Sequence, residues 1–87
     1  MITNKIILEV LKRIDGCINI IEESFSNKSP NNEELNFLET IYYEYSIRFV
    51  FHRYYENNGL FSFDVPLDII SSDDWELKLE KLLTENL

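Results

Sequence analysis

The chain has 87 residues, of which 45% are hydrophobic and 14% aromatic, and its formal net charge is −8. A chain of this length forms a single domain, here residues 1–87, and its apolar content is too high for a disordered acidic segment. The lone cysteine, Cys17, excludes an intramolecular disulfide and indicates a cytoplasmic location. The longest apolar runs of the chain are three residues, so no membrane span is expected. No signal-peptide pattern opens the sequence.

The carboxylates fall into two blocks. Residues 31–47 hold four acids and residues 60–77 hold five, and neither block contains Lys or Arg. Such blocks favour a basic protein partner, although a solubilising role explains them equally simply. They disfavour direct binding of nucleic acid, because phosphate contacts require Lys and Arg.

The first element is predicted to be an amphipathic helix over residues 4–25. Its apolar residues recur at three- and four-residue spacings, and Gly16 interrupts the helix without changing the phase of the stripe. Residues 26–32 read as a loop in which Ser29 caps a second helix and Pro30 occupies its first position. The stripe of the first helix consists of Ile7, Val10, Leu11, Ile14, Ile18, Ile21 and Phe25.

Residues 31–65 fit two structures. Alternating apolar residues over 43–52, followed by Asn58 and Gly59, predict a β-hairpin over about 43–65. However, no Gly or Pro interrupts residues 31–58, and Glu44 precedes Arg48 by four residues, which favours one long helix ending at Gly59. We therefore expect an all-α bundle of three to four helices, with an α+β fold carrying the hairpin packed on helices as the alternative.

The C-terminal region is predicted to be extended over residues 60–71, because Pro66 interrupts any helix there. A last helix begins at Ser72 or Asp73, with Asp73 and Glu76 at capping-box spacing. The segment from Ile70 to Leu77 resembles the end of colicin D-type immunity proteins, through its acidic cap before a leucine-bearing helix. This pattern is generic and the first 60 residues add nothing specific to it, so it assigns no family.

No residue set in the sequence indicates catalysis. His52 is the only histidine, Cys17 lies on the apolar side of the first helix, and the chain has no phosphate-binding loop or catalytic motif. Asp73, Asp74 and Glu76 lack the spacing of a calcium loop, and the dipole of a helix start explains them. We expect no enzyme activity, no cofactor and no metal.

The composition instead favours a protein-binding function. Our leading interpretation is a small acidic inhibitor that covers the active or nucleic-acid-binding surface of a basic partner, as toxin-immunity proteins and phage-encoded inhibitors do. The alternative is a structural or regulatory helical module that forms homo-oligomers, such as a homodimer, through exposed aromatic residues that are too numerous to bury in one small core. The expected partner-binding residues are Glu22, Glu23, Glu33, Glu34, Glu39, Tyr43, Asp73, Asp74, Trp75 and Glu76.

Overall fold

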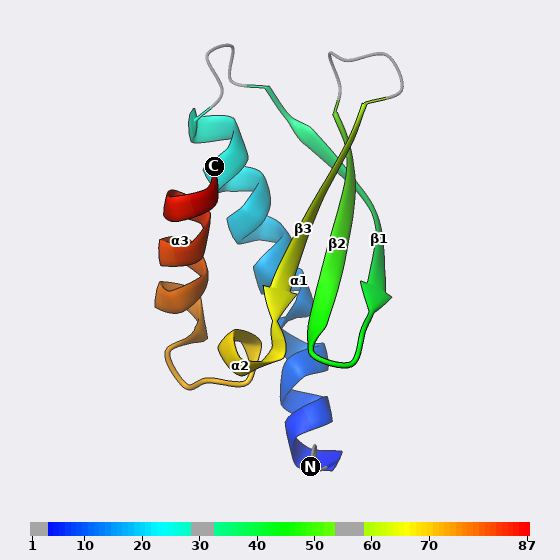
Figure 1. Cartoon of the computed structure of the whole chain (residues 1–87), viewed down its shortest axis with the longest axis vertical. Helices are drawn as coiled ribbons and strands as arrows, with labels where there is room; N and C mark the ends of the chain where they lie inside the picture. Colours follow the sequence, from blue (N-terminus) through cyan, green and yellow to red (C-terminus); the bar gives the residue numbers. More distant parts are fainter. Residues whose placement is uncertain (1–3, 29–32, 54–58) are drawn as a thin grey trace.

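The computed structural model describes residues 4–28, 33–53 and 59–87, which form an α+β fold (Figure 1). The strands form one antiparallel sheet in the order β1-β2-β3. The elements along the chain are α1 (Asn4–Lys28), β1 (Leu35–Tyr42), β2 (Ser46–Arg53), β3 (Leu60–Pro66), α2 (Leu67–Ile70) and α3 (Trp75–Asn86).

The expected all-α bundle is therefore wrong, and the α+β alternative is closer. The long helix predicted over residues 31–58 is replaced by β1 and β2, so Gly59 precedes a strand instead of capping a helix. The hairpin of the alternative corresponds to β2 and β3, while β1 is an additional strand. The predicted helix start at Ser29 and Pro30 lies outside the described residues, as does the connection 54–58.

The alternation of side chains along β2 explains why this segment is a strand. Ile47, Phe49 and Phe51 are almost completely buried, whereas the intervening Arg48 and Val50 are half-buried on the other face. In a strand, alternate side chains share one face, so all three large residues reach the core. In a helix the same residues would point in different directions. The gain from burying them together outweighs the favourable helix spacing of Glu44 and Arg48, which is worth only about 0.5 kcal/mol.

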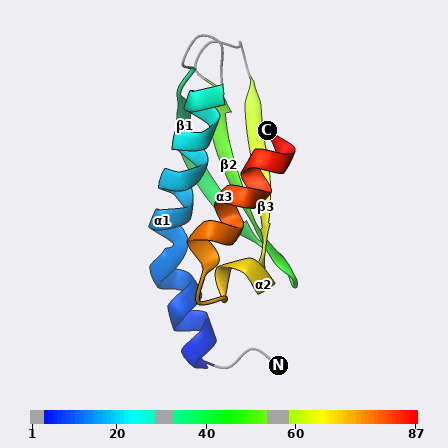
Figure 2. The same cartoon turned by 90° about the vertical axis from the view of Figure 1, so that its left-hand side faces the viewer.

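Both longer helices cover the same face of the sheet (Figure 2). The predicted first helix is confirmed and extends to Lys28 as α1, and it packs beside α3. Its buried residues Val10, Cys17 and Ile21 meet the inward side chains of the strands and two leucines of α3, Leu79 and Leu83. The opposite face of the sheet has no helix on it in the described structure, as Figure 1 shows.

The C-terminal region differs in detail from the prediction. Part of the segment expected to be extended forms the short helix α2, and α3 begins at Trp75 with Asp74 at the N-cap position. The expected capping box is wrong, since no side-chain hydrogen bond caps α3. The Ser72 hydroxyl instead donates to Asp74 Oδ1 at 2.6 Å.

Contacts from α1 hold the turn between α2 and α3. Arg13 Nη1 donates to the carbonyl oxygens of Ile70 at 2.6 Å and Ser72 at 2.9 Å. The Arg13 guanidinium also lies 5.8 Å from the centre of the Trp75 ring, a cation–π distance. Gly16 sits beneath this ring: a Cβ atom there would lie 2.7 Å from Trp75 Cη2. The glycine within α1 thus provides the space in which Trp75 packs.

We expect Gly16→Ala to lower the free energy of unfolding, although the same change stabilises an unhindered helix by about 1 kcal/mol. The new methyl group overlaps the Trp75 ring, and overpacking costs about 1–3 kcal/mol. Urea denaturation at fixed protein concentration measures the difference. Asn19→Ala, at an exposed position of the same helix, is the matched control and should be neutral or stabilising.

Candidate functional site

The sequence-predicted acidic residues fall into separate groups. Glu22 and Glu23 are in the last two turns of α1, and Glu22 lies near Glu34, which precedes β1. Residues 73–76 instead lead into α3, where Trp75 packs against Gly16 in the middle of α1. Burial raises the pKa of Glu22, and the nearby charge of Glu34 raises it further. These acids therefore do not form one continuous surface with Asp73, Asp74 and Glu76.

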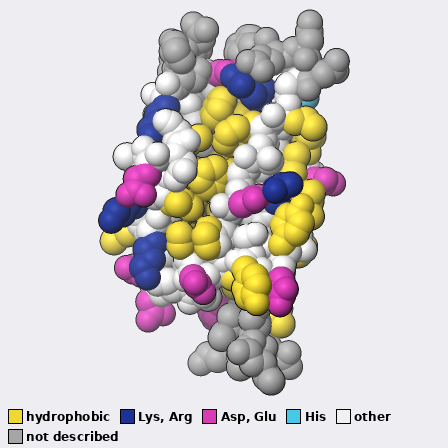
Figure 3. Space-filling view, in the orientation of Figure 1, with side chains coloured by type: hydrophobic (Ala, Val, Ile, Leu, Met, Phe, Trp, Pro, Cys, Tyr) yellow, Lys and Arg dark blue, Asp and Glu magenta, His cyan; other side chains and the backbone are white. Residues whose placement is uncertain are grey.

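Bases from elsewhere in the chain interrupt both acidic blocks. Arg53 donates to both oxygens of Glu33, at 3.2 and 3.1 Å. Arg48 does the same to Asp64, at 2.7 and 3.0 Å, and its guanidinium holds the pKa of that carboxyl below its usual range. On the face in Figure 3, acidic and basic side chains are accordingly intermixed around a band of hydrophobic ones.

The α3 end shows the same mixing. Lys78 Nζ lies 3.3 Å from Asp74 Oδ1. The pKa of Asp74 is lowered, first by the hydrogen bond from Ser72 and then by Lys78. Asp73 and Glu76 are exposed, while Trp75 is half-buried against Gly16. The exposed Glu39 lies on β1 and belongs to neither of these acidic groups.

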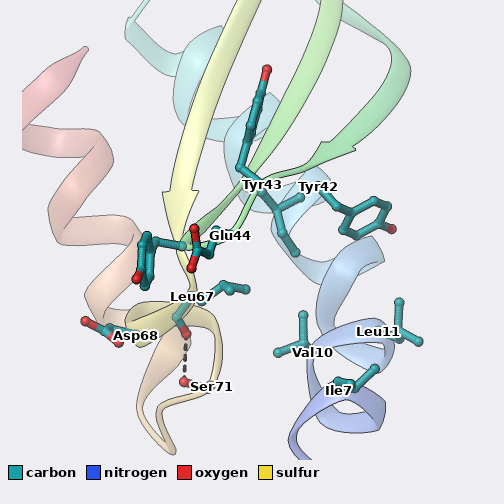
Figure 4. A pocket seen from close by; sticks show the side chains of 11 residues that line it. Ile7, Val10, Leu11, Tyr42, Tyr43, Glu44, Leu67, Asp68 and Ser71 are labelled. Atoms are coloured by element: carbon teal, nitrogen blue, oxygen red, sulfur yellow. Dashed lines mark hydrogen bonds between the residues drawn. The ribbon is translucent and has the colours of Figure 1, made fainter. Parts of the chain in front are cut away.

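Tyr43 alone among the predicted partner-binding residues lines an apolar groove in the described part of the structure. This groove has a volume of about 680 Å³ and lies between the N-terminal half of α1, the β1–β2 turn and α2 (Figure 4). Ile7, Val10 and Leu11 form its α1 wall. Ile7 and Leu11 are one helical turn apart, so they share a face of α1.

The β1–β2 turn forms the second wall. Tyr43 N–H donates to the Ser46 carbonyl at 2.9 Å and closes the turn, while Leu67 N–H donates to the Tyr45 carbonyl at 2.9 Å and ties it to α2. The Tyr43 ring also lies 5.1 Å from the Arg48 guanidinium, a cation–π contact. From these walls Tyr42, Tyr43, Glu44, Tyr45, Ile47, Leu67, Asp68 and Ser71 line the groove.

Exposed hydrophobic side chains concentrate around this groove. Nine large hydrophobic side chains are exposed in the described part of the chain, and five of them line it. Leu8, 58% exposed, lies beside Leu11 on the adjoining face of α1. The lining contains two carboxylates, Glu44 and Asp68, and no base. A concentration of exposed apolar residues of this kind is typical of an interaction surface.

Sequence reasoning missed most of this surface. Ile7 and Leu11 belong to the stripe predicted as core, but the first turns of α1 extend past the sheet (Figure 1), so no strand or helix that the structure describes covers them. Leu8 lies outside that stripe, which is the signal that points to an exposed apolar position. The excess of tyrosines is a second signal, and two of these tyrosines, Tyr42 and Tyr45, line the groove.

Cys17 lies in the core, completely buried. Burial raises the pKa of its thiol to about 12, against a smaller lowering by Arg13. Because the thiolate is the reactive form, we expect no measurable reaction with Ellman's reagent at pH 8 in native buffer and one equivalent of thiol in guanidinium. Reaction of the folded protein at the rate of a free cysteine would contradict this placement.

Within residues 4–28, 33–53 and 59–87, no three His, Cys, Asp or Glu side chains are placed together to hold a metal ion. None of the helices in these ranges has the length and hydropathy of a membrane span. Comparisons with models of protein families, with curated proteins and with solved structures found no match.

Proposed function

We propose that the chain is a protein-interaction module that associates through the groove between α1, the β1–β2 turn and α2. The observation that carries the proposal is the concentration of exposed hydrophobic side chains there, including three tyrosines. Tyrosine is favoured in interfaces because it supplies a large contact area with little loss of conformational freedom and retains a polar tip.

The distribution of charge supports this form of binding over an acidic inhibitory surface. Glu33, Asp64 and Asp74 each face a base within 3.3 Å, so part of the acidic surface is neutralised internally. The remaining acids are spread over several places, including Glu39 on β1 and Glu44 and Asp68 in the groove. A basic partner would therefore meet smaller and more separated acidic patches than the uninterrupted blocks of the sequence suggest.

Site-specific photo-cross-linking tests the proposal. Tyr45, 77% exposed on the groove wall, is replaced by a benzophenone amino acid of similar shape, and the protein is irradiated in the cells that produce it. We expect a discrete protein adduct, which mass spectrometry identifies. The same probe at Leu77, 70% exposed on α3, is the control and should give none.

A second substitution links the adduct to the groove. Leu11→Glu places a charge on the α1 wall, so the adduct from position 45 should be lost. Absence of any adduct at position 45, or an adduct that Leu11→Glu leaves unchanged, would overturn the proposal. An adduct formed only by the control probe would do the same.

A further inference from the structure

We infer that the groove binds a basic amphipathic helix of another protein, which packs apolar side chains against α1 and places Lys or Arg side chains beside Glu44 and Asp68. This inference rests on the proposed function, since it states the chemistry of the partner for the same groove. Figure 4 shows how the lining is divided: Ile7, Val10 and Leu11 lie on α1, and the two carboxylates lie on the other side of the groove. A segment that fills the groove therefore meets an apolar surface on one side and negative charge on the other.

The two carboxylates of the groove lack the basic partners that other acids of the chain have. Glu33, Asp64 and Asp74 each lie within 3.3 Å of a base. In the described part of the chain, neither Glu44 nor Asp68 forms an ion pair, and no Lys or Arg lines the groove. Both side chains are exposed and so can meet a partner. Basic residues on that partner would complement them, whereas an acidic segment would be repelled.

Two arginines from segments that flank the groove are engaged elsewhere. Arg48 donates to both carboxylate oxygens of Asp64, at 2.7 and 3.0 Å. Arg13 donates to two carbonyl oxygens of the turn between α2 and α3. Lys12 follows Leu11 on α1 but does not line the groove. The chain therefore leaves the charge of its groove to be balanced by a partner.

The backbone of the β1–β2 turn favours a helical partner over an extended one. An extended segment gains affinity by pairing with free backbone groups at the edge of a strand. At this turn, Tyr43 N–H already donates to the Ser46 carbonyl and Leu67 N–H to the Tyr45 carbonyl, each at 2.9 Å. A helix satisfies its own backbone groups and binds through its side chains, which suits an apolar wall with charge across from it.

Synthetic peptides of about 18 residues test this chemistry on the purified full chain. Two of them carry leucines at helical spacing on one face, with either lysine or glutamate at the other positions. Fluorescence anisotropy of the dye-labelled leucine–lysine peptide should show saturable binding with a Kd below about 0.1 mM, and the leucine–glutamate peptide should not bind up to about 1 mM. A third peptide, with the same leucines and lysines in an order that forms no apolar face, is the control for charge alone. It should bind at least about tenfold more weakly than the first.

Substitutions locate the binding. Glu44→Gln combined with Asp68→Asn removes two charges from the groove, so we expect the Kd of the leucine–lysine peptide to rise at least about threefold. Glu80→Gln combined with Glu85→Gln removes the same charge from exposed positions of α3 and should change it by less than about twofold. Leu11→Ser removes an apolar contact from the α1 wall and should raise the Kd at least about tenfold. Circular dichroism of each variant establishes that it folds.

The absence of binding by the leucine–lysine peptide, or equal binding of the leucine–glutamate peptide, would overturn the inference. So would equal effects of the two double variants, because the attraction would then come from net charge and not from the groove. The proposed function is tested separately. A position-45 adduct with another protein, found together with a leucine–lysine peptide that does not bind, supports the proposed function and contradicts the basic helix. No adduct and no peptide binding would overturn both.

Discussion

Replacing Phe49 by Ala is expected to lower the free energy of unfolding by about 3–5 kcal/mol. Phe49 is fully buried in the central strand, paired with Thr40 on β1 and Phe63 on β3. Its removal leaves a cavity where the sheet meets the helices. Because small domains are stable by only about 5–15 kcal/mol, this variant should be close to unfolding at room temperature. Chemical denaturation at fixed protein concentration measures the loss.

Val50→Ala is the matched control for the register of β2. Val50 is adjacent in sequence but lies on the helix-free face, half-buried, so its truncation should cost under about 1.5 kcal/mol. Comparable losses at both positions would contradict the alternation of faces and with it the sheet. Large losses at Ile47 and Phe51, with small ones at Arg48 and Val50, would extend the same test along the strand.

The second large effect is expected at Glu33, a residue that the sequence assigns to partner binding. Its side chain is 11% exposed and accepts two hydrogen bonds from Arg53, whose guanidinium also lies 5.5 Å from the Phe25 ring. Glu33→Ala removes the carboxylate that accepts both of these hydrogen bonds from the partly buried Arg53. We expect a loss of about 2–3 kcal/mol in the free energy of unfolding.

The adjacent Glu34 is exposed and provides the control. Glu34→Ala should change stability by less than about 0.5 kcal/mol, as surface substitutions usually do. Thermal denaturation of both variants with the wild type separates the two cases. Equal stability of the Glu33 and Glu34 variants would show that the ion pair with Arg53 contributes nothing to the free energy of unfolding. Glu33 would then behave as an ordinary surface carboxylate.

The sequence predicts α1 correctly, because its stripe keeps a helical phase through Gly16. The sequence also contains the period of two along β2. It nevertheless favours a long helix over residues 31–58, because no Gly or Pro separates β1 from β2. The pattern of strand β1 explains why this prediction is wrong. A bulge between Phe37 and Glu39 shifts its register, so Phe37 and Thr40, three residues apart, pair with the buried Phe51 and Phe49. A spacing of three resembles a helix and conceals the strand.

The site is harder to predict for a related reason. Acidic blocks without bases are a property of the linear sequence, whereas strand pairing brings Arg48 opposite Asp64 from another segment. The apolar groove exists because the first turns of α1 extend past the sheet. Only the tertiary structure decides which residues of the apolar stripe of α1 are buried and which are exposed. Tyr43 was identified because the number of aromatic residues exceeded what one small core accommodates.

Amide chemical shifts test most directly whether the groove is the interaction surface. Two-dimensional ¹⁵N–¹H spectra of the wild-type chain, with and without the protein that the position-45 adduct identifies, report each residue separately. We expect the shifts that this protein causes to cluster at residues 7–11, 42–45 and 67–71, and to disappear in Leu11→Glu. Shifts confined to residues 22–34 or 73–76, or spectra that the added protein leaves unchanged, would contradict this assignment.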